Sequence, residues 1–376
     1  AYMIGVTGTN GKTTVAEIVY RLLGDTCAYI GTNGRKFKNK HFSMRNTTPD
    51  VDRLYMYFKE FIDAGCNTIC MEASSESYYR HRLDDIKYDV GIVTNITEDH
   101  LNIHKTIENY VDCKCQLVKH VKDDGYSILN SSDKYFDKFK KEANGSIVSY
   151  GYKDSDTLKI EDYTLKRDKT IINFRYNNKS YEVISPLLGS FNVDNLAASI
   201  LCLLCKGIGF EKIVERIKKL NQIEGRMETM PFVSKYTVIL DYAHTTDALD
   251  NILTFLDMIK ETRIITVTGS AGGREKSKRP GMGKVVLEKS DYVIFTMDDP
   301  RFEDPNKIID DLVSGSDKTN YERIVDRKKA IYKALDIAEA KDIVLIAGKG
   351  RDDYMAIDDK YLPYCDYDVI KSYYEQ

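Results

Sequence analysis

The sequence has no long hydrophobic run and little net charge. No apolar stretch reaches the roughly 18 to 20 residues that a membrane-spanning helix needs. Residues 1–6 also lack the parts of a signal peptide, so we expect a cytoplasmic protein. The formal net charge of −3 at pH 7 gives no reason to expect a nucleic-acid partner or an anionic membrane surface. We therefore expect small-molecule partners and a monomeric protein.

The eight cysteines form no metal-binding or disulfide pattern. The one CxxC pair, Cys202 and Cys205, lies in an apolar helical stretch, where packing in a core is the simpler interpretation. Cys113 and Cys115 flank Lys114 but have no second pair at the spacing of a zinc site. We expect reduced thiols, as in the cytoplasm.

The pattern of apolar residues predicts an α/β protein with two domains. With 376 residues, of which 42% are hydrophobic, the chain can bury more than one core. Short β-rich runs such as 68–71 and 90–95 alternate with helical patterns such as 52–64, which predicts a parallel sheet flanked by helices. Period-two strands over 157–184 predict an antiparallel insert, and helices resume over 192–220.

A second series of strands and helices opens at Val238 and includes the strand-like segments 264–268, 292–296 and 343–347. This pattern is typical of a Rossmann-like domain. We place the boundary near Gly225, so that residues 1–224 form a P-loop ATP-binding domain with the insert and residues 225–376 form the second domain.

The strongest single motif is Gly8-Thr9-Asn10-Gly11-Lys12-Thr13-Thr14, which follows a strand and precedes the helical pattern 15–23. Strand, glycine-rich turn and helix occur in the order that a P-loop requires. Backbone N–H groups of the turn can bind phosphate oxygens, Lys12 can reach the outer phosphates, and Thr13 can ligate Mg²⁺. The general P-loop pattern differs only in having glycine where Val6 stands.

Three further residues are predicted to converge at the same edge of the sheet. Glu72 ends an apolar strand, His100 follows another, and Lys114 lies on the helical pattern after Glu108. Sites in open α/β sheets form outside the carboxyl ends of the strands.

Eight ordered motifs continue the pattern of the loop over nearly the whole chain. They are Asn46-Thr47-Thr48-Pro49-Asp50, Met71-Glu72-Ala73-Ser74-Ser75, Asp99-His100-Leu101-Asn102-Ile103-His104, Gly189-Ser190-Phe191-Asn192, Gly225-Arg226-Met227-Glu228, Asp241-Tyr242-Ala243-His244, Asp298-Asp299-Pro300-Arg301 and Gly348-Lys349-Gly350. With this order the chain resembles the Mur ligase superfamily, and most closely its muramyl-tripeptide synthetase (MurE-type) branch. The sequence starts at the P-loop strand, so we expect it to lack the uridine-nucleotide-binding domain that precedes this strand in the family.

The resemblance implies ATP as cofactor with two Mg²⁺ sites. Thr13 and Glu72 would hold one metal ion, and His100 with a carbamylated Lys114 would hold or orient the second. Carbamylation would convert the lysine from a cation that repels Mg²⁺ into an anionic oxygen ligand. The remaining nucleotide contacts implied by the family are Asn192 and Asn195, at the adenine, and Arg226, Asp241, His244 and Lys278, in the second domain.

The substrate contacts are also implied by the resemblance. Those for a glycopeptide carboxylate are Thr47, Thr48, Ser74 and Arg82, and those for the incoming amino acid are Asp298, Asp299, Arg301, Gly348 and Asp352. Diaminopimelate-adding members usually carry asparagine where Asp299 stands. An ionised Asp299 would repel a distal carboxylate and attract an ammonium, which shifts the expected acceptor to lysine or another basic amino acid. Asp352 replaces the usual glutamate and has a shorter reach.

These features predict an ATP-dependent, ADP-forming amide ligase of cell-wall precursor synthesis. The carboxylate of a peptide would become an acyl-phosphate and then be coupled to lysine or another diamino acid. Two alternatives stay open: a ligase of the same superfamily with another donor, resembling folylpolyglutamate or cyanophycin synthetases, and a non-catalytic protein that uses ATP binding as a switch.

Overall fold

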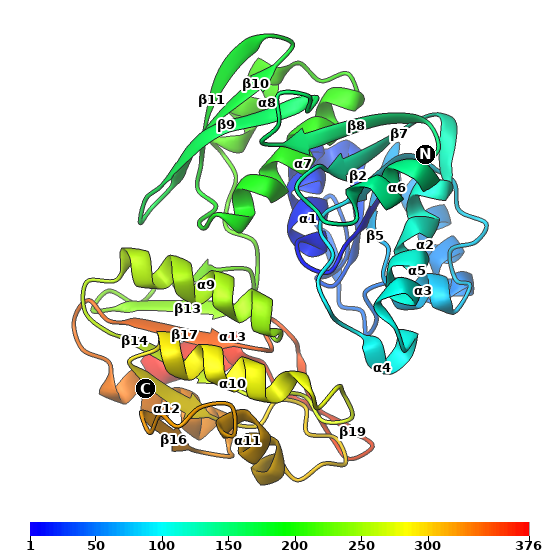
Figure 1. The fold of residues 1–376 in the computed structure, drawn as a ribbon. Helices are drawn as coiled ribbons and strands as arrows, with labels where there is room; N and C mark the ends of the chain where they lie inside the picture. Colours follow the sequence, from blue (N-terminus) through cyan, green and yellow to red (C-terminus); the bar gives the residue numbers. More distant parts are fainter. Residues whose placement is uncertain (376) are drawn as a thin grey trace. The chain divides into compact units, whose positions relative to one another are not determined.

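The computed structural model describes residues 1–375, which form two compact units. Unit 1 spans Ala1–Asn221 and unit 2 begins at Gln222. Among the described residues, no helix combines the length and apolar content that a membrane span requires. Figure 1 shows the order of the elements along the chain, and each unit is described by itself below.

The described residues of unit 1 form one sheet of 11 strands with helices on both faces. The strands are β1 (Tyr2–Thr7), β2 (Cys27–Gly31), β3 (Gly34–Phe37), β4 (Lys40–Phe42), β5 (Thr68–Glu72), β6 (Tyr88–Val93), β7 (Val121–Asn130), β8 (Ser146–Gly151), β9 (Leu158–Leu165), β10 (Thr170–Tyr176) and β11 (Lys179–Ser185). The α-helices are α1 (Lys12–Leu23), α2 (Val51–Asp63), α3 (Ser75–Tyr79), α4 (Leu101–His104), α5 (Ile107–Lys119), α6 (Phe136–Glu142), α7 (Phe191–Cys205) and α8 (Phe210–Ile217).

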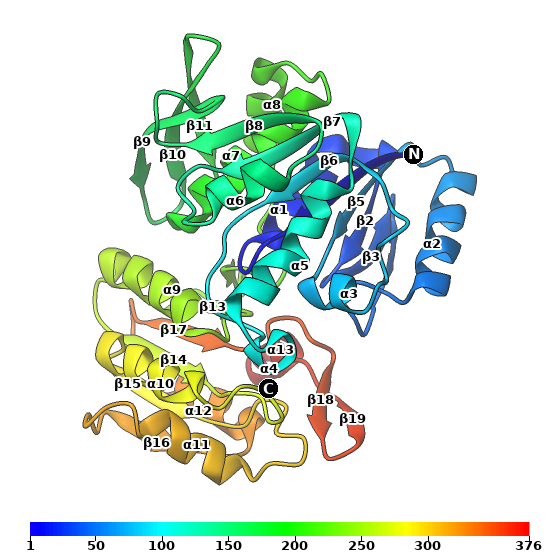
Figure 2. The ribbon, with the colours of Figure 1, turned by 45° about the vertical axis from the view of Figure 1, so that its right-hand side comes forward.

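The strand order is β11-β10-β9-β8-β7-β6-β1-β5-β2-β3-β4, with β1 inside the parallel part. The crossover through α1 runs from β1 toward β2, whereas the crossover through α5 runs from β6 toward β7 in the other direction. Because parallel crossovers are right-handed, the two helices cover opposite faces, and α7 packs beside α1 (Figure 2). Pairing of Val6 with Glu72 and of Thr7 with Val93 brings the ends of three strands to one carboxyl edge.

The sequence patterns of unit 1 match the structure closely. The strand predicted over 68–71 is β5, and the helix predicted over 52–64 is α2. The insert predicted over 157–184 is the antiparallel set β9, β10 and β11, which extends the edge of the main sheet. Buried and partly exposed residues alternate along β10 because one face of the strand packs inward, as the burial of Ile172 and Phe174 shows.

Unit 2 is built on a sheet of six strands in the order β12-β13-β17-β14-β15-β16, in which β12 alone is antiparallel to its neighbour. Its strands are β12 (Glu228–Thr229), β13 (Thr237–Asp241), β14 (Ile264–Thr268), β15 (Tyr292–Phe295), β16 (Tyr321–Arg323), β17 (Ile343–Ala347) and the separate hairpin β18 (Tyr354–Ile357) and β19 (Lys360–Pro363). Its helices are α9 (Thr246–Ile259), α10 (Lys278–Lys289), α11 (Pro305–Val313), α12 (Arg327–Ile337) and α13 (Asp366–Tyr374).

The strands predicted for the second domain over 264–268 and 343–347 are present as β14 and β17. Both are buried along their whole length, as expected for parallel strands covered on two faces. The predicted division at Gly225 and the assignment of a role to each domain stay predictions. The carboxyl ends of β13, β14, β15 and β17 carry the segments in which most of the predicted unit 2 site residues lie.

Candidate active site

The P-loop of unit 1 joins β1 to α1 at the carboxyl edge of the sheet. Gly8 and Gly11 have φ angles of 146° and 84°, and a Cβ at either position would clash with a neighbouring side chain. The Nζ atom of Lys12 donates hydrogen bonds to the carbonyl groups of Gly8 and Thr9, at 2.9 and 3.0 Å. The loop thus has the tight backbone and the lysine that phosphate binding requires.

Asn192 and Asn195 lie near the start of α7, next to this loop. The Nδ2 atom of Asn195 donates to Oδ1 of Asn192 at 3.0 Å, and Asn192 donates to the carbonyl of Leu188 at 2.7 Å. A Cβ on Gly11 would lie only 2.3 Å from Oδ1 of Asn195, so α7 and the P-loop are in close contact. The fold therefore brings together two segments about 180 residues apart in the sequence.

Glu72 links the P-loop to the residues predicted to bind the acyl substrate. Its side chain is fully buried, and its Oε2 accepts a hydrogen bond from Oγ1 of Thr13 at 3.1 Å. Its carbonyl oxygen accepts from Oγ1 of Thr48 at 2.9 Å, and that hydroxyl in turn lies 3.3 Å from Oγ of Ser74. Arg82 donates to the carbonyl of Thr48 at 3.3 Å.

Thr47 completes this group through Thr32, since their hydroxyl oxygens are 3.1 Å apart. Arg82 also forms an ion pair with Asp50, at 2.9 Å. The structure therefore gathers the four predicted acyl-site residues of unit 1 around the end of β5.

Lys114 is buried beneath the P-loop. Its side chain is 1% exposed, and its Nζ donates to the carbonyl of Gly8 at 2.7 Å and lies 4.5 Å from the ring centre of Tyr110. Burial, followed by the charge of Lys12, lowers the pKa of Lys114 well below its usual value. A lowered pKa favours the neutral amine, which is the form that reacts with carbon dioxide.

His100 lies near the same tyrosine. Its ring centre is 6.3 Å from that of Tyr110, and its Nε2 is 3.3 Å from a carboxylate oxygen of Asp99. His100 has a left-handed backbone with φ of 56° at the start of α4. Glu72 thus contacts the P-loop residue Thr13, Lys114 contacts Gly8 and Tyr110, and His100 lies near the Tyr110 ring, so a common metal site of the three stays a prediction.

In unit 2, the predicted nucleotide residues group around Tyr242. The guanidinium carbon of Arg226 lies 4.6 Å from the centre of that ring. Asp241, at the end of β13, accepts from two backbone N–H groups at 2.7 Å, and burial raises the pKa of its carboxyl group. Nδ1 of His244 lies 2.8 Å from the carbonyl of Tyr242, and Lys278 donates to the carbonyl of His244 at 3.1 Å.

The predicted amino-acid site surrounds a lysine that the sequence patterns did not assign. Lys349 has no exposed surface, and its Nζ lies 2.8 Å from Asp299, 3.7 Å from Asp352 and 4.0 Å from Asp298. Burial alone would lower the pKa of Lys349, but the three carboxylates raise it, led by Asp298. The sequence did contain a signal for this buried lysine, because Lys349 lies between two glycines just after the apolar run 343–347.

The charge argument built on Asp299 left out a partner that the structure supplies, Lys349. Oδ1 of Asp299 accepts from Nζ of Lys349 at 2.8 Å and from the backbone N–H of Ala356 at 2.9 Å. The carboxylate is thus neutralised inside the protein, and a preference for lysine does not follow from it. Burial raises the pKa of Asp298, and burial raises the pKa of Asp352 to about 7.

Gly348 and Arg301 border this cluster. Gly348 has φ of 118°, and a Cβ there would lie 2.5 Å from Oδ2 of Asp298, which explains the glycine. Arg301, also left-handed with φ of 52°, is half-buried and donates from Nη1 to the carbonyl of Gly272 at 3.1 Å.

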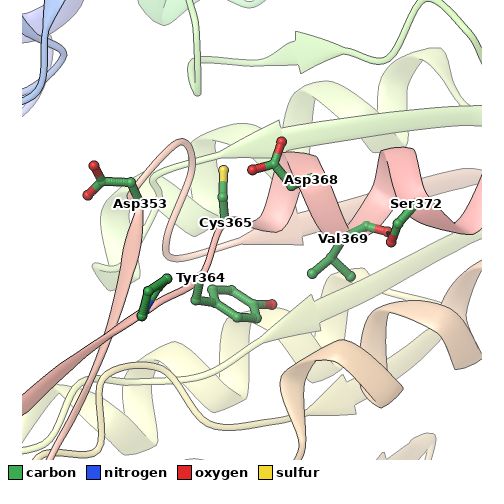
Figure 3. Close-up of a pocket in the computed structure, with 7 residues that line it drawn as sticks. Asp353, Tyr364, Cys365, Asp368, Val369 and Ser372 are labelled. Atoms are coloured by element: carbon green, nitrogen blue, oxygen red, sulfur yellow. Dashed lines mark hydrogen bonds between the residues drawn. The ribbon is translucent and has the colours of Figure 1, made fainter.

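Potential metal-ligating side chains are not clustered in this structure among the residues that it describes. In the described part of the chain, no group of three or more His, Cys, Asp or Glu residues is arranged to hold a metal ion. A cavity of about 410 Å³ lies beside the end of β19 and the start of α13, and none of its lining residues is a predicted site residue (Figure 3). Its lining residues are Asp353, Pro363, Tyr364, Cys365, Asp368, Val369 and Ser372.

Comparison with known families agrees with this arrangement. Residues 6–203 match the Mur ligase middle domain and residues 225–350 match the Mur ligase glutamate ligase domain. The chain belongs to the Mur ligase family, and it is an ATP-dependent, ADP-forming acid–amino-acid ligase that acts on small molecules.

Its relatives include two curated enzymes, both named UDP-N-acetylmuramoyl-L-alanyl-D-glutamate–2,6-diaminopimelate ligase. That of Clostridium tetani is 37% identical over 381 residues, covering 100% of this chain and 78% of the relative. That of Bacillus cereus is 35% identical, covering 98% and 77%. A solved structure of a ligase with the same name has a TM-score of 0.68 and 31% identity, and the match covers 100% of this chain and 78% of that one.

Proposed function

We propose that this ligase joins a glutamate carboxylate of a UDP-N-acetylmuramoyl dipeptide to an amino group of 2,6-diaminopimelate, in cell-wall precursor synthesis. The names of the two curated relatives support these substrates. The observation that carries the proposal is Glu72, which contacts the P-loop residue Thr13 through its carboxylate and the acyl-site residue Thr48 through its carbonyl. One residue thereby joins the phosphate site to the carboxylate site.

The reaction follows from this adjacency. An oxygen of the donor carboxylate attacks the γ-phosphorus of ATP, the bond to the β-phosphate oxygen breaks, and ADP leaves. The amine of the acceptor then attacks the carbonyl carbon of the acyl-phosphate, the ammonium having lost a proton, and phosphate leaves. Lys12 is assigned to the outer phosphates, Asn192 and Asn195 to adenine, and Thr47, Thr48, Ser74 and Arg82 to the donor.

The residues present suit Mg²⁺, which prefers hard oxygen ligands. Glu72 Oε2 and Thr13 Oγ1 are only 3.1 Å apart and would hold one ion together with nucleotide phosphates. Lys114 as a carbamate and His100 would hold the second. Bound Mg²⁺ would neutralise the phosphate charges that otherwise repel the carboxylate.

For the acceptor, Asp298 and Asp352 are assigned to an ammonium group, Gly348 to a close backbone contact and Arg301 to a carboxylate. Arg226, Asp241, His244 and Lys278 of unit 2 are assigned to the nucleotide. In this scheme residues 1–224 bind ATP and the donor, and residues 225–376 bind the amino acid. We also propose that the protein works as a cytoplasmic monomer, since ATP is available there and its cysteines are free thiols.

The experiment that tests the function is trapping of the acyl-phosphate. The enzyme is mixed with ATP, Mg²⁺, the UDP-linked dipeptide and hydroxylamine, and a hydroxamate is expected. Phosphate release is then measured with diaminopimelate, lysine and ornithine, and diaminopimelate should be preferred. Formation of a stable phosphorylated product without hydroxamate would indicate a kinase, and ATP binding without any turnover would indicate a switch protein.

A further inference from the structure

The carboxylate of Glu72 is held by more donors than the P-loop alone supplies. Its Oε1 accepts from the hydroxyl of Tyr29 and from the backbone N–H of Thr32, both at 2.8 Å. Its Oε2 accepts from Oγ1 of Thr32 at 3.2 Å and from Oγ1 of Thr13 at 3.1 Å. A buried carboxylate is tolerated only with such hydrogen bonding, and here it fixes the rotation of the whole group.

Tyr29 lies on β2 with no exposed surface, and its hydroxyl has two partners. The backbone N–H of Asn33 donates to this hydroxyl oxygen at 3.3 Å. Because the oxygen is the acceptor in that bond, its own hydrogen is available for Glu72. The direction of the Tyr29 to Glu72 bond is therefore set by the turn that follows β2.

The same turn approaches the carboxylate unusually closely. A Cβ on Gly31 would lie 2.2 Å from Oε1 of Glu72 and 2.3 Å from the hydroxyl oxygen of Tyr29. Only glycine lets the backbone come near enough for the N–H of Thr32 to reach Glu72.

A buried ion pair supports the turn from the other side. Glu17, on α1, has no exposed surface and accepts from Nδ2 of Asn33 at 3.2 Å and from Nζ of Lys36 at 2.7 Å. The turn between β2 and β3 is thus tied to α1, the helix that also carries Thr13.

We propose that Tyr29 and Thr32 are positioning residues for a metal-binding carboxylate. The Tyr29 hydroxyl and the Thr32 backbone N–H hold Oε1 of Glu72, the Thr32 hydroxyl contacts Oε2, and Oε2 is thereby presented beside Thr13 to the metal of a nucleotide complex. The inference rests on the proposed function, because it assumes that Glu72 is a metal ligand. Removing a residue that orients a metal ligand typically lowers metal affinity by roughly 10-fold to 100-fold.

The test measures ADP binding to the full chain by calorimetry across a series of Mg²⁺ concentrations. Tyr29→Phe removes one donor to Oε1 and should raise the Mg²⁺ concentration needed for half-maximal enhancement of ADP binding by roughly 10-fold. ADP affinity without Mg²⁺ should stay unchanged. Thr32→Val keeps the backbone N–H but removes the hydroxyl contact to Oε2, and it should act in the same direction. Thr32→Ser keeps that hydroxyl and should retain the wild-type response.

Tyr20→Phe is the matched control. The ring of Tyr20 lies 6.0 Å from that of Tyr29, but its hydroxyl contacts the carbonyl of Lys38 at 3.5 Å and not Glu72. This variant loses the same atom from the same ring pair, so its Mg²⁺ response should match the wild type.

Glu72→Gln distinguishes the metal-binding role of Glu72 from the positioning role of Tyr29 and Thr32. If Glu72→Gln loses the Mg²⁺ response while Tyr29→Phe and Thr32→Val keep it, the positioning role is refuted and the metal assignment stands. If Glu72→Gln itself keeps the response, the metal assignment of the proposed function fails, and the positioning role fails with it. Should Tyr29→Phe not fold, the Thr32→Val and Thr32→Ser pair decides alone, and equal responses of these two variants would overturn the proposal.

Discussion

Replacing Arg327 with methionine should destabilise unit 2 more than any exposed substitution in it. Arg327 and Asp366 are both fully buried, and the guanidinium donates to the two carboxylate oxygens at 2.8 and 2.7 Å. It also donates to the carbonyl of Met297 at 3.3 Å and to that of Ala347 at 2.9 Å. These carbonyls directly precede Asp298 and Gly348, so Arg327 joins the two segments assigned to the acceptor.

The magnitude follows from what the substitution leaves behind. Among the side chains that the structure describes, Asp366 would keep the hydroxyl of Tyr364, at 2.8 Å, and would remain as a buried charge without its cation. Breaking a buried pair on one side costs about 3–5 kcal/mol. The double variant Arg327→Met/Asp366→Leu removes both charges and should lose less stability than Arg327→Met alone, although two carbonyl groups lose the donor that Arg327 supplies.

Hydrogen exchange in increasing denaturant is the appropriate assay, because a chain of two units need not unfold in one step. Peptides from β15, β17 and α12 report the free energy of opening of unit 2. The control is Arg323→Met, since the Arg323 and Asp310 side chains are 37% and 60% exposed and such a pair contributes less than about 1 kcal/mol. The reasoning is refuted if Arg327→Met loses no more than this control.

Three further outcomes are expected. Lys12→Ala should reduce ATP turnover by at least about 100-fold through lost phosphate stabilisation, and turnover within a few-fold of wild type would contradict the role of the P-loop lysine. Lys114→Ala should be inactive but partly restored by short-chain carboxylic acids in a phosphate-release assay; normal turnover without them would exclude a carbamate. With Asp352 ionising at a pKa of about 7, the KM for the acceptor should fall roughly tenfold from pH 6 to pH 8, following the ionised fraction. Asp352→Asn should flatten this dependence, and an unchanged pH profile in that variant would assign it to another group.

Features that depend on neighbours along the chain were predictable from the sequence. The periodicity of apolar residues predicted β5, α2 and the insert of β9, β10 and β11, because burial of one face imposes a local repeat. The P-loop was predictable for the same reason, because its glycines, lysine and threonines are neighbours in the sequence, within residues 8–14. Motif order was sufficient to identify the family, which the matches over residues 6–203 and 225–350 confirm.

The partners of the charged groups were decided only by the tertiary structure. Asp299 and Lys349 are 50 residues apart in the sequence, and Tyr29 and Glu72 are 43 apart. No periodic pattern connects such pairs, since each depends on which strands become neighbours and on how their turns approach. The sequence therefore determined where Asp299 and Glu72 stand, at the ends of strands. The fold decided that Asp299 is neutralised by Lys349 and that Glu72 is held by Tyr29 and Thr32, because a charge removed from water must find its partner in three dimensions.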